Sequence, residues 1–169
     1  MSDHDYRLRF HTDADLPAML QVIRTAFAQY AGRLDPPSSA ERKTLEVVRA
    51  ELQSARAIVA EANGDLVGCI FLHLRGEEAY VDRLSVLPDQ RGRGIGAALL
   101  CAAEAEARSQ GAEACCLSVR LVLEVQQRFY RERGYVHASF GTHAGYPLPT
   151  YRNMRKPLNT AASIEETLL

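Results

Sequence analysis

Hydrophobic and polar residues follow two different periodicities along the chain, and each periodicity predicts a different element. Apolar residues recur at helical spacing over residues 16–30 and 45–52, which predicts two helices in the first third. Alternation or short apolar runs predict four strands, at residues 6–10, 57–62, 66–73 and 79–86. Asn63-Gly64 separates two of these strands and is the strongest short hairpin signal. The middle of the chain is therefore expected to form an antiparallel meander.

The pattern changes after Pro88, where a polar, glycine-rich stretch replaces the tight turns of the meander. A helix is expected from about Ile95 to Gly111, followed by a strand over 114–119. A strand, a helix and a strand in this order predict a parallel strand pair. Val122, Val125 and Phe129 form an apolar stripe that predicts a further helix. Two strands are expected after it, over residues 135–140 and 150–154. Together these elements predict a mixed sheet.

Composition and charge narrow the class of protein. The chain has 169 residues, 47% of them hydrophobic, which favours one soluble domain. Its 20 basic and 21 acidic residues nearly cancel, so we expect neither nucleic acid nor a membrane as a partner. No apolar run approaches ~18 residues, and the first residues lack the pattern of a signal peptide. The four cysteines form no CxxC pair, so we expect reduced thiols and a cytoplasmic protein.

Three alternating glycines, Gly92, Gly94 and Gly96, lie between a predicted strand and a predicted helix. Glycine permits unusual backbone angles and the close approach of a ligand. The helix start presents unpaired N–H groups and the positive end of the helix dipole, which together suit a pyrophosphate. Arg91 and Arg93 add positive charge beside the glycines. A tight turn would need only one glycine, so an anion cradle is the better interpretation.

The type of pyrophosphate ligand is narrowed by the surrounding residues. No Lys-Ser or Lys-Thr follows the glycines, which excludes a Walker loop. Gly92-x-Gly94-x-x-Ala97 matches a dinucleotide fingerprint, and Glu113 lies at about the expected ~20-residue spacing. However, Glu113 precedes the next strand, and Arg120 stands at the far end, where the acid should lie. Because the preceding elements also form a meander, the nicotinamide interpretation is the weaker one.

The chain resembles the GNAT superfamily of acetyl-CoA-dependent N-acetyltransferases. The resemblance rests on Arg91-Gly-Arg-Gly94-Ile-Gly96, preceded by Leu84-Ser-Val-Leu-Pro88, and on a later segment from Leu117 to Tyr135. It extends over about residues 6–157 and implies a single α+β (α/β) domain over 1–157, with a C-terminal tail over 158–169. The implied fold is a mixed, mostly antiparallel sheet of about six to seven strands with about four helices. A parallel strand pair that splays apart would hold the cofactor.

The resemblance also implies roles for residues that bind acetyl-CoA. The backbone of Leu84 and Val86 would bind the pantetheine arm. Tyr130 would protonate the departing thiolate as a general acid, although packing beside Phe129 is an alternative role. Leu123 stands where family members often carry an asparagine that contacts the cofactor, so that contact is lost or replaced. The pyrophosphate cradle would consist of Arg91, Gly92, Arg93, Gly94, Ile95, Gly96 and Ala97.

Acetylation of an amine also needs a proton acceptor. Tyr80, Asp82 and Leu84 would share one face of a strand, and the family often places a base or a water-ordering residue near the first two. Asp82 is therefore the first candidate for the base, and a salt bridge with Arg75 is the equally weighted alternative. His73, alone at a strand end, is expected to be structural.

The acceptor is less clearly defined. Tyr80, His143 and Tyr146 are candidates for the acceptor pocket, although residues 141–149 can equally be a tight Gly/Pro loop. The histidines, cysteines and acids lack metal-ligand spacing, so no metal is expected. We expect a small-molecule amine as the acceptor. The alternatives are a protein amino terminus or lysine, and a non-catalytic acyl-CoA sensor; a homodimer is plausible for this fold.

Overall fold

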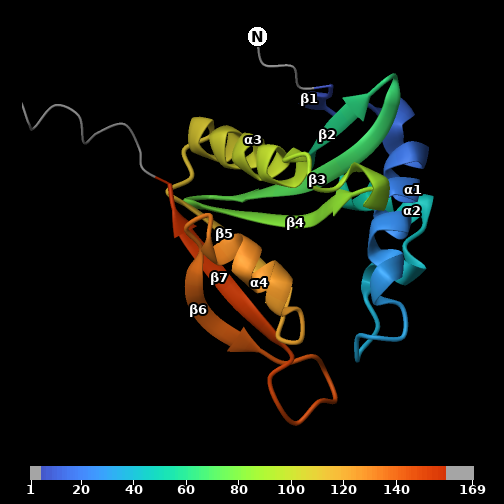
Figure 1. The fold of residues 1–169 in the computed structure, drawn as a ribbon. Coiled ribbons are helices and arrows are strands. Elements are labelled where there is room, and N and C mark those ends of the chain that lie inside the picture. Colours follow the sequence, from blue (N-terminus) through green and yellow to red (C-terminus); the bar gives the residue numbers. More distant parts are fainter. Residues whose placement is uncertain (1–4, 159–169) are drawn as a thin grey trace, which may run out of the picture. The chain divides into compact units, whose positions relative to one another are not determined.

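The computed structural model describes residues 5–158 and contains a seven-stranded sheet in the order β1-β2-β3-β4-β5-β7-β6 (Figure 1). Its strands are β1 (Arg7–Phe10), β2 (Arg56–Ala62), β3 (Asp65–Arg75), β4 (Glu78–Val86), β5 (Ala114–Arg120), β6 (Val136–Gly141) and β7 (Tyr151–Pro157). The α-helices among the described residues are α1 (Leu16–Phe27), α2 (Leu45–Glu51), α3 (Ile95–Ser109) and α4 (Glu124–Arg131). The predicted elements are all present, with ends shifted by a few residues, and the mixed sheet is confirmed.

The described residues form two compact units. The first unit comprises the described residues up to His73 together with Val81–Ala103, and the second comprises Leu74–Tyr80 together with the described residues from Glu104 onward. Both β4 and α3 begin in one unit and end in the other. The predicted tail lies outside the described residues apart from Leu158, which is buried and donates its N–H to the Glu113 carbonyl at 2.7 Å.

Local sequence signals explain how the first unit begins. Thr12 and Asp15 form a capping box around a short 3₁₀ turn, which leads directly into α1. Asn63 and Gly64 both have positive φ angles, 52° and 84°, as the two-residue hairpin between β2 and β3 requires. The predicted meander is therefore fixed by its turn residues.

The core of the first unit lies on both faces of β2 and β3. On one face, α1 and α2 pack against the strands through a cluster of buried residues: Leu16, Met19, Val22, Ile23, Ala40, Val48, Ala57, Val59, Cys69 and Phe71. The neighbouring Gly68 faces α3 instead, and a Cβ added there would lie 2.9 Å from the Ser85 carbonyl oxygen and 3.1 Å from Leu99. Gly68 therefore permits close packing of α3 on the strands, which fixes the helix that follows the glycine-rich turn.

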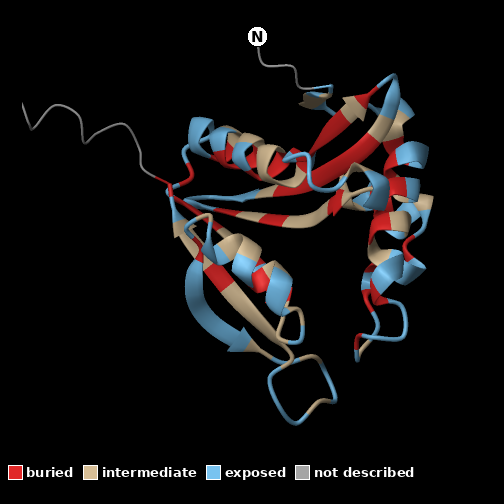
Figure 2. Ribbon diagram, in the orientation of Figure 1, coloured by how far each residue is buried: buried red, intermediate tan, exposed pale blue. Residues whose placement is uncertain are grey.

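In the second unit, β5 pairs in parallel with β4 and antiparallel with β7, and β6 forms the edge. The parallel ladder joins Glu78 to Ala114, Ala79 to Cys115 and Tyr80 to Cys116, which are the first three residues of each strand. Such a short ladder is what the predicted separation of the two strands requires. Figure 2 shows β6 exposed along almost its whole length.

The interior of the second unit contains a polar network. Tyr135 is 1% exposed, and its hydroxyl donates to Glu104 Oε1 at 2.9 Å. Lys156 Nζ donates to the other oxygen of the same carboxylate, also at 2.9 Å. Both oxygens of Glu104 are thus satisfied, which offsets the cost of burying its charge. Burial raises the pKa of Tyr135 far above its usual range, so Tyr135 stays neutral.

The predicted apolar stripe of α4 is wrong in part. Val122 and Val125 are each 71% exposed, and the buried side chain of this helix is Gln127, 5% exposed. The helix begins only at Glu124, so Val122 lies in the preceding turn, where helical spacing does not apply. Gln127 Nε2 donates to the Arg120 and Leu121 carbonyls at 3.2 and 2.8 Å, which turns this face of α4 inward.

Candidate active site

The glycine-rich turn lies directly before α3. Gly92 and Gly94 adopt φ angles of 78° and 79°, a conformation that glycine reaches without strain. A Cβ added at either position would have no neighbour within 4 Å, so the space above the turn is open. α3 begins at Ile95 and runs for 15 residues, and the first N–H groups of a helix have no partner within the helix itself. These features fit a pyrophosphate.

Both arginines of the turn have protein partners. Arg91 donates to Gln29 Oε1 at 3.0 Å and to the Ala26 carbonyl at 3.2 Å, which ties the turn to the end of α1. Arg93 hydrogen-bonds Gln90 and lies 3.5 Å from the Asp5 carboxylate. Their charges thus lie beside the turn, and each arginine also holds a neighbouring segment.

β4 carries a backbone irregularity just before the two residues predicted to bind the pantetheine arm. Arg83 has a φ of 54°, an uncommon conformation for a non-glycine residue. The pleat is therefore interrupted between Asp82 and Leu84, and the predicted shared face of Tyr80, Asp82 and Leu84 does not follow from simple alternation. Leu84 and Val86 lie beyond the residues of β4 that pair with β5.

Asp82, the predicted base, lies against a histidine rather than against Arg75. His73 Nε2 and Asp82 Oδ1 are 3.0 Å apart across β3 and β4, and their side chains are 18% and 30% exposed. Sequence reasoning assigned His73 a structural role and missed this pair. Counting outward from the two-residue turn after Arg75 sets His73 opposite Tyr80, so that Asp82 lies on the diagonal. This count could have indicated the pair.

A buried lysine, also missed from the sequence, lies near the same pair. The side chain of Lys43 is 1% exposed and its ammonium forms an ion pair with Glu51. Its Nζ also lies 5.7 Å from the centre of the Phe71 ring. Burial lowers the pKa of Lys43; Glu51 opposes this shift, and the charge of Arg83 adds to it. The first unit therefore encloses a lysine that interacts electrostatically with Arg83 and Asp82.

Tyr130, the predicted general acid, lies near the end of α4 in the second unit. Its ring is half-buried and packs edge-on against Phe129 and Tyr135, with centroids 5.2 and 5.8 Å away. Two aromatic neighbours thus fix its orientation. Leu123 is the residue just before α4, and its apolar side chain does not cap the helix. The buried Gln127 holds the turn between β5 and α4 instead.

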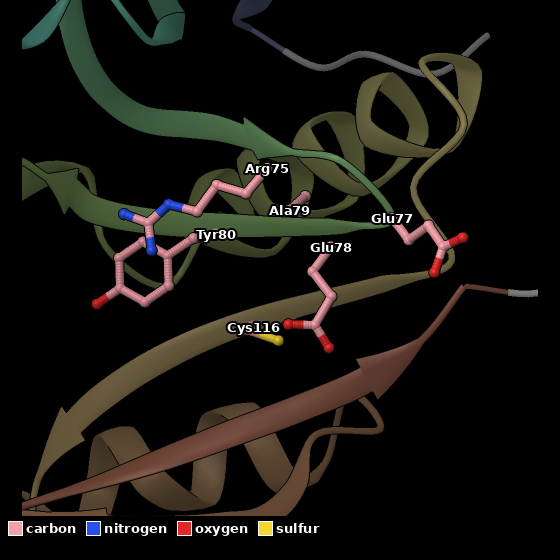
Figure 3. A pocket seen from close by; sticks show the side chains of 6 residues that line it. All are labelled: Arg75, Glu77, Glu78, Ala79, Tyr80 and Cys116. Atoms are coloured by element: carbon pink, nitrogen blue, oxygen red, sulfur yellow. The ribbon is translucent and has the colours of Figure 1, made fainter.

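Tyr80 lines a pocket of about 430 Å³ in the second unit. Figure 3 shows the Arg75 guanidinium over the Tyr80 ring, at 4.9 Å from its centroid, and the Glu78 carboxylate near Cys116. Glu78 also pairs with Arg155 at 3.1 Å. Burial raises the pKa of the Cys116 thiol, and Glu78 raises it further, so Cys116 is not an activated nucleophile. The pocket offers charged and aromatic contacts for a polar molecule.

His143 and Tyr146 lie together in the loop before β7, as predicted, with ring centroids 6.3 Å apart. His143 also packs against Tyr151 at 5.1 Å and hydrogen-bonds the Thr150 hydroxyl. Burial lowers the pKa of His143, and Arg120 lowers it further, so the ring is neutral at physiological pH. The loop therefore presents a neutral, aromatic surface.

Two further properties bear on the class of protein. Among residues 5–158, none of the helices combines the length and the apolar composition that crossing a membrane requires. Within the same residues, histidines, cysteines and acids do not gather in groups of three or more that could hold a metal ion.

The short parallel pairing of β4 with β5 and the glycine-rich turn directly before α3 agree with the resemblance of the sequence to acetyltransferases. The model of the acetyltransferase (GNAT) domain matches residues 53–137, and the chain belongs to this family. The chain is 32% identical to an IAA acetyltransferase of Azospirillum brasilense over 83% of its own length and 91% of that protein. These matches confirm the resemblance seen in the sequence and its preference over the nicotinamide interpretation.

Other acetyltransferases are also similar to this chain. An aminoalkylphosphonate N-acetyltransferase of Salmonella typhimurium is 40% identical over 88 residues, which span 48% of this chain and 57% of that protein. The PaiA N-acetyltransferase of Thermoplasma acidophilum, solved in complex with coenzyme A, has a TM-score of 0.77 at 24% identity. That match covers 90% of this chain and 98% of PaiA, and it confirms the fold.

Proposed function

We propose that this protein transfers an acetyl group from acetyl-CoA to a primary amine of a small molecule, by direct attack of the amine on the thioester. The observation that carries the proposal is the turn at Gly92 and Gly94. Both glycines have positive φ angles and open space above them, and a 15-residue helix begins directly afterwards. This geometry suits a pyrophosphate, which coenzyme A carries.

Each group of residues proposed to lie around acetyl-CoA has a separate role in the reaction. The N–H groups from Arg91 to Ala97 hold the pyrophosphate, and Arg91 and Arg93 supply positive charge. The backbone of Leu84 and Val86 holds the pantetheine arm as an added strand would. When the amine attacks the carbonyl, the C–N bond forms and the C–S bond breaks. Tyr130 gives its proton to the departing thiolate.

The acceptor is inferred from the relatives and from the charge of the chain. Two relatives are named for acetylating an aminoalkylphosphonate and IAA. The chain has a net charge of −1 and contains no acidic or basic tract that would dock a large charged partner. The pocket beside Tyr80 and the aromatic loop at His143 and Tyr146 are the surfaces that would contact this amine.

A coupled assay of the purified protein tests the proposal. Acetyl-CoA is supplied with 2-aminoethylphosphonate, with n-butylamine, or with a short peptide that has a free amino terminus. Coenzyme A release is followed with a thiol reagent, and the acetylated product is identified by mass spectrometry. Because Cys101 is exposed and reacts with such reagents, reactions without amine supply the background.

Acetylation of either small amine, with the peptide unchanged, is the expected result. Acetylation of the peptide alone would replace the small-molecule acceptor with a protein amino terminus. Binding of acetyl-CoA without acetylation of any amine would favour an acyl-CoA sensor and would contradict catalysis.

A further inference from the structure

We infer that the acceptor amine also carries an anionic group, a carboxylate or a phosphonate, and that Arg83 binds this group. The inference rests on the proposed acetyl transfer and names the class of acceptor. Arg83 lies on β4, and its Nη2 donates to Ser39 Oγ at 2.6 Å, in the segment between α1 and α2. Arg83 is half-buried and Ser39 is exposed, so a small molecule can reach this pair from solvent.

The guanidinium of Arg83 has few partners within the protein. Among residues 5–158, the ion pairs do not include Arg83. Its Nε is buried and has no hydrogen-bond partner within the same residues, which costs free energy. A guanidinium presents five N–H donors in a planar fork that matches the oxygens of an anion. An anionic ligand would therefore engage donors that the protein itself leaves unused.

The charged groups around Arg83 leave its positive charge without a direct counter-ion. The acid next to it in sequence, Asp82, bonds His73 Nε2 at 3.0 Å. The buried ammonium of Lys43 acts on Arg83 electrostatically, as a second positive charge. Glu51 forms its ion pair with Lys43. Because both carboxylates have other partners, Arg83 can form a charge-assisted hydrogen bond with an anion from outside the protein.

Both residues of this pair are held in place by their own backbone surroundings. Ser39 begins a 3₁₀ turn that is capped by the Ser38 hydroxyl, which accepts from the Ala40 N–H at 3.2 Å. On β4, the Arg83 carbonyl accepts from the Ser85 hydroxyl at 2.9 Å, which supports the unusual φ of 54°. The Ser39 oxygen accepts from Arg83, so its own proton is available to donate to an anion. Donors fixed in advance bind a ligand at a lower entropic cost.

The place of Arg83 along β4 connects it to the proposed transfer. Arg83 directly precedes Leu84, whose backbone is proposed to bind the pantetheine arm that carries the thioester. The pyrophosphate of acetyl-CoA is assigned to the turn at Gly92 and Gly94, in the same compact unit. Arg83 therefore remains for the second substrate. An acceptor whose anionic end binds Arg83 would present the amine at its other end to the thioester.

The test compares three amines of matched length: n-propylamine, β-alanine and 2-aminoethylphosphonate. They differ at the end opposite the amine, which is a methyl group, a carboxylate or a phosphonate. Values of kcat and KM are measured at saturating acetyl-CoA, relative to the concentration of neutral amine, for the wild type, Arg83→Gln and Arg49→Gln. Arg83→Gln removes the charge and keeps a polar side chain. Arg49→Gln is the matched control, because Arg49 is an exposed arginine of α2 in the same unit.

We expect the wild type to prefer an anionic amine over n-propylamine by about 10- to 100-fold in kcat/KM, the usual effect of hydrogen bonds to a charged group. The larger preference identifies the anion as carboxylate or phosphonate. Arg83→Gln should abolish the preference by raising KM for the anionic amine, because the contact is made before the transition state as well as in it. Its turnover of n-propylamine and its Kd for acetyl-CoA should stay unchanged, which also shows that this variant folds. Arg49→Gln should match the wild type.

Four results would overturn the inference. Equal kcat/KM values for the three amines in the wild type would exclude an anionic acceptor. A preference that persists in Arg83→Gln would place the anion elsewhere. An equal loss for all three amines in Arg83→Gln would indicate a structural role, and weaker binding of acetyl-CoA would assign Arg83 to the cofactor. By contrast, a wild type that binds acetyl-CoA but acetylates no amine would contradict the proposed function itself.

Discussion

Introducing a negative charge at Gly94 should abolish most of the affinity for acetyl-CoA, through charge repulsion rather than loss of the fold. Gly94 has a φ of 79°, and a Cβ there would meet no atom within 4 Å. Asp and Asn are the non-glycine residues that best tolerate this conformation. Gly94→Asp and Gly94→Asn therefore share the same backbone cost of about 1–2 kcal/mol and the same shape. They differ only in charge.

The effect of that charge follows from Coulomb's law. A carboxylate about 5 Å from one phosphate charge, at an effective dielectric constant of about 20, is repelled by about 3 kcal/mol. This energy corresponds to a Kd on the order of 100-fold weaker for Gly94→Asp than for Gly94→Asn. The difference should shrink as salt rises, because the screening length falls from about 10 Å at 0.1 M to about 3 Å at 1 M.

Calorimetric titration with acetyl-CoA at low and high salt measures both effects. Gly64→Asp is the matched control, since Gly64 also has a positive φ, 84°, and no neighbour within 4 Å of an added Cβ, but lies in the β2–β3 hairpin. Urea unfolding checks that the two Gly94 variants are equally stable. Equal Kd values for Gly94→Asp and Gly94→Asn would refute the anion cradle.

Three further predictions concern other residues. Tyr130→Phe should lower kcat by about 10²-fold or more and leave the acetyl-CoA Kd unchanged; retained turnover would exclude Tyr130 as the acid. Gly68→Val should lower the free energy of unfolding by about 1–3 kcal/mol or more, because an added Cβ lies 2.9 Å from a carbonyl oxygen; urea unfolding with no loss would contradict the close packing of α3. Burial lowers the pKa of Lys43 in the folded protein. Between this lowered pKa and the ordinary pKa of lysine, the unfolded state binds more protons than the folded state, so the free energy of unfolding rises with pH. Lys43→Met should lack that rise in urea unfolding at several pH values, and an identical pH dependence in both proteins would contradict it.

The order of helices and strands could be predicted from the sequence because particular turn residues determine it. Asn63-Gly64 fixes a hairpin by its positive φ angles, and the glycines at 92 and 94 fix an open turn in the same way. Backbone requirements of this kind are visible in a single sequence. The parallel pairing of β4 with β5 followed from the intervening helix α3.

The side-chain partners were less predictable because they depend on register and packing. The pairing of His73 with Asp82 depends on how β3 aligns with β4, and the irregularity at Arg83 changes which residues share a face. The burial of Gln127 instead of Val125 depends on carbonyl groups at the end of β5, which no periodicity of α4 contains. Long-range hydrogen bonds decided these positions.

The most direct test of the account is calorimetric titration of the wild-type protein with acetyl-CoA, with NADH and NADPH as comparison ligands. The account predicts saturable binding of acetyl-CoA at one site per chain and no heat of binding from either nucleotide. Binding of NADH or NADPH without acetyl-CoA binding would contradict the assignment of the glycine-rich turn to coenzyme A.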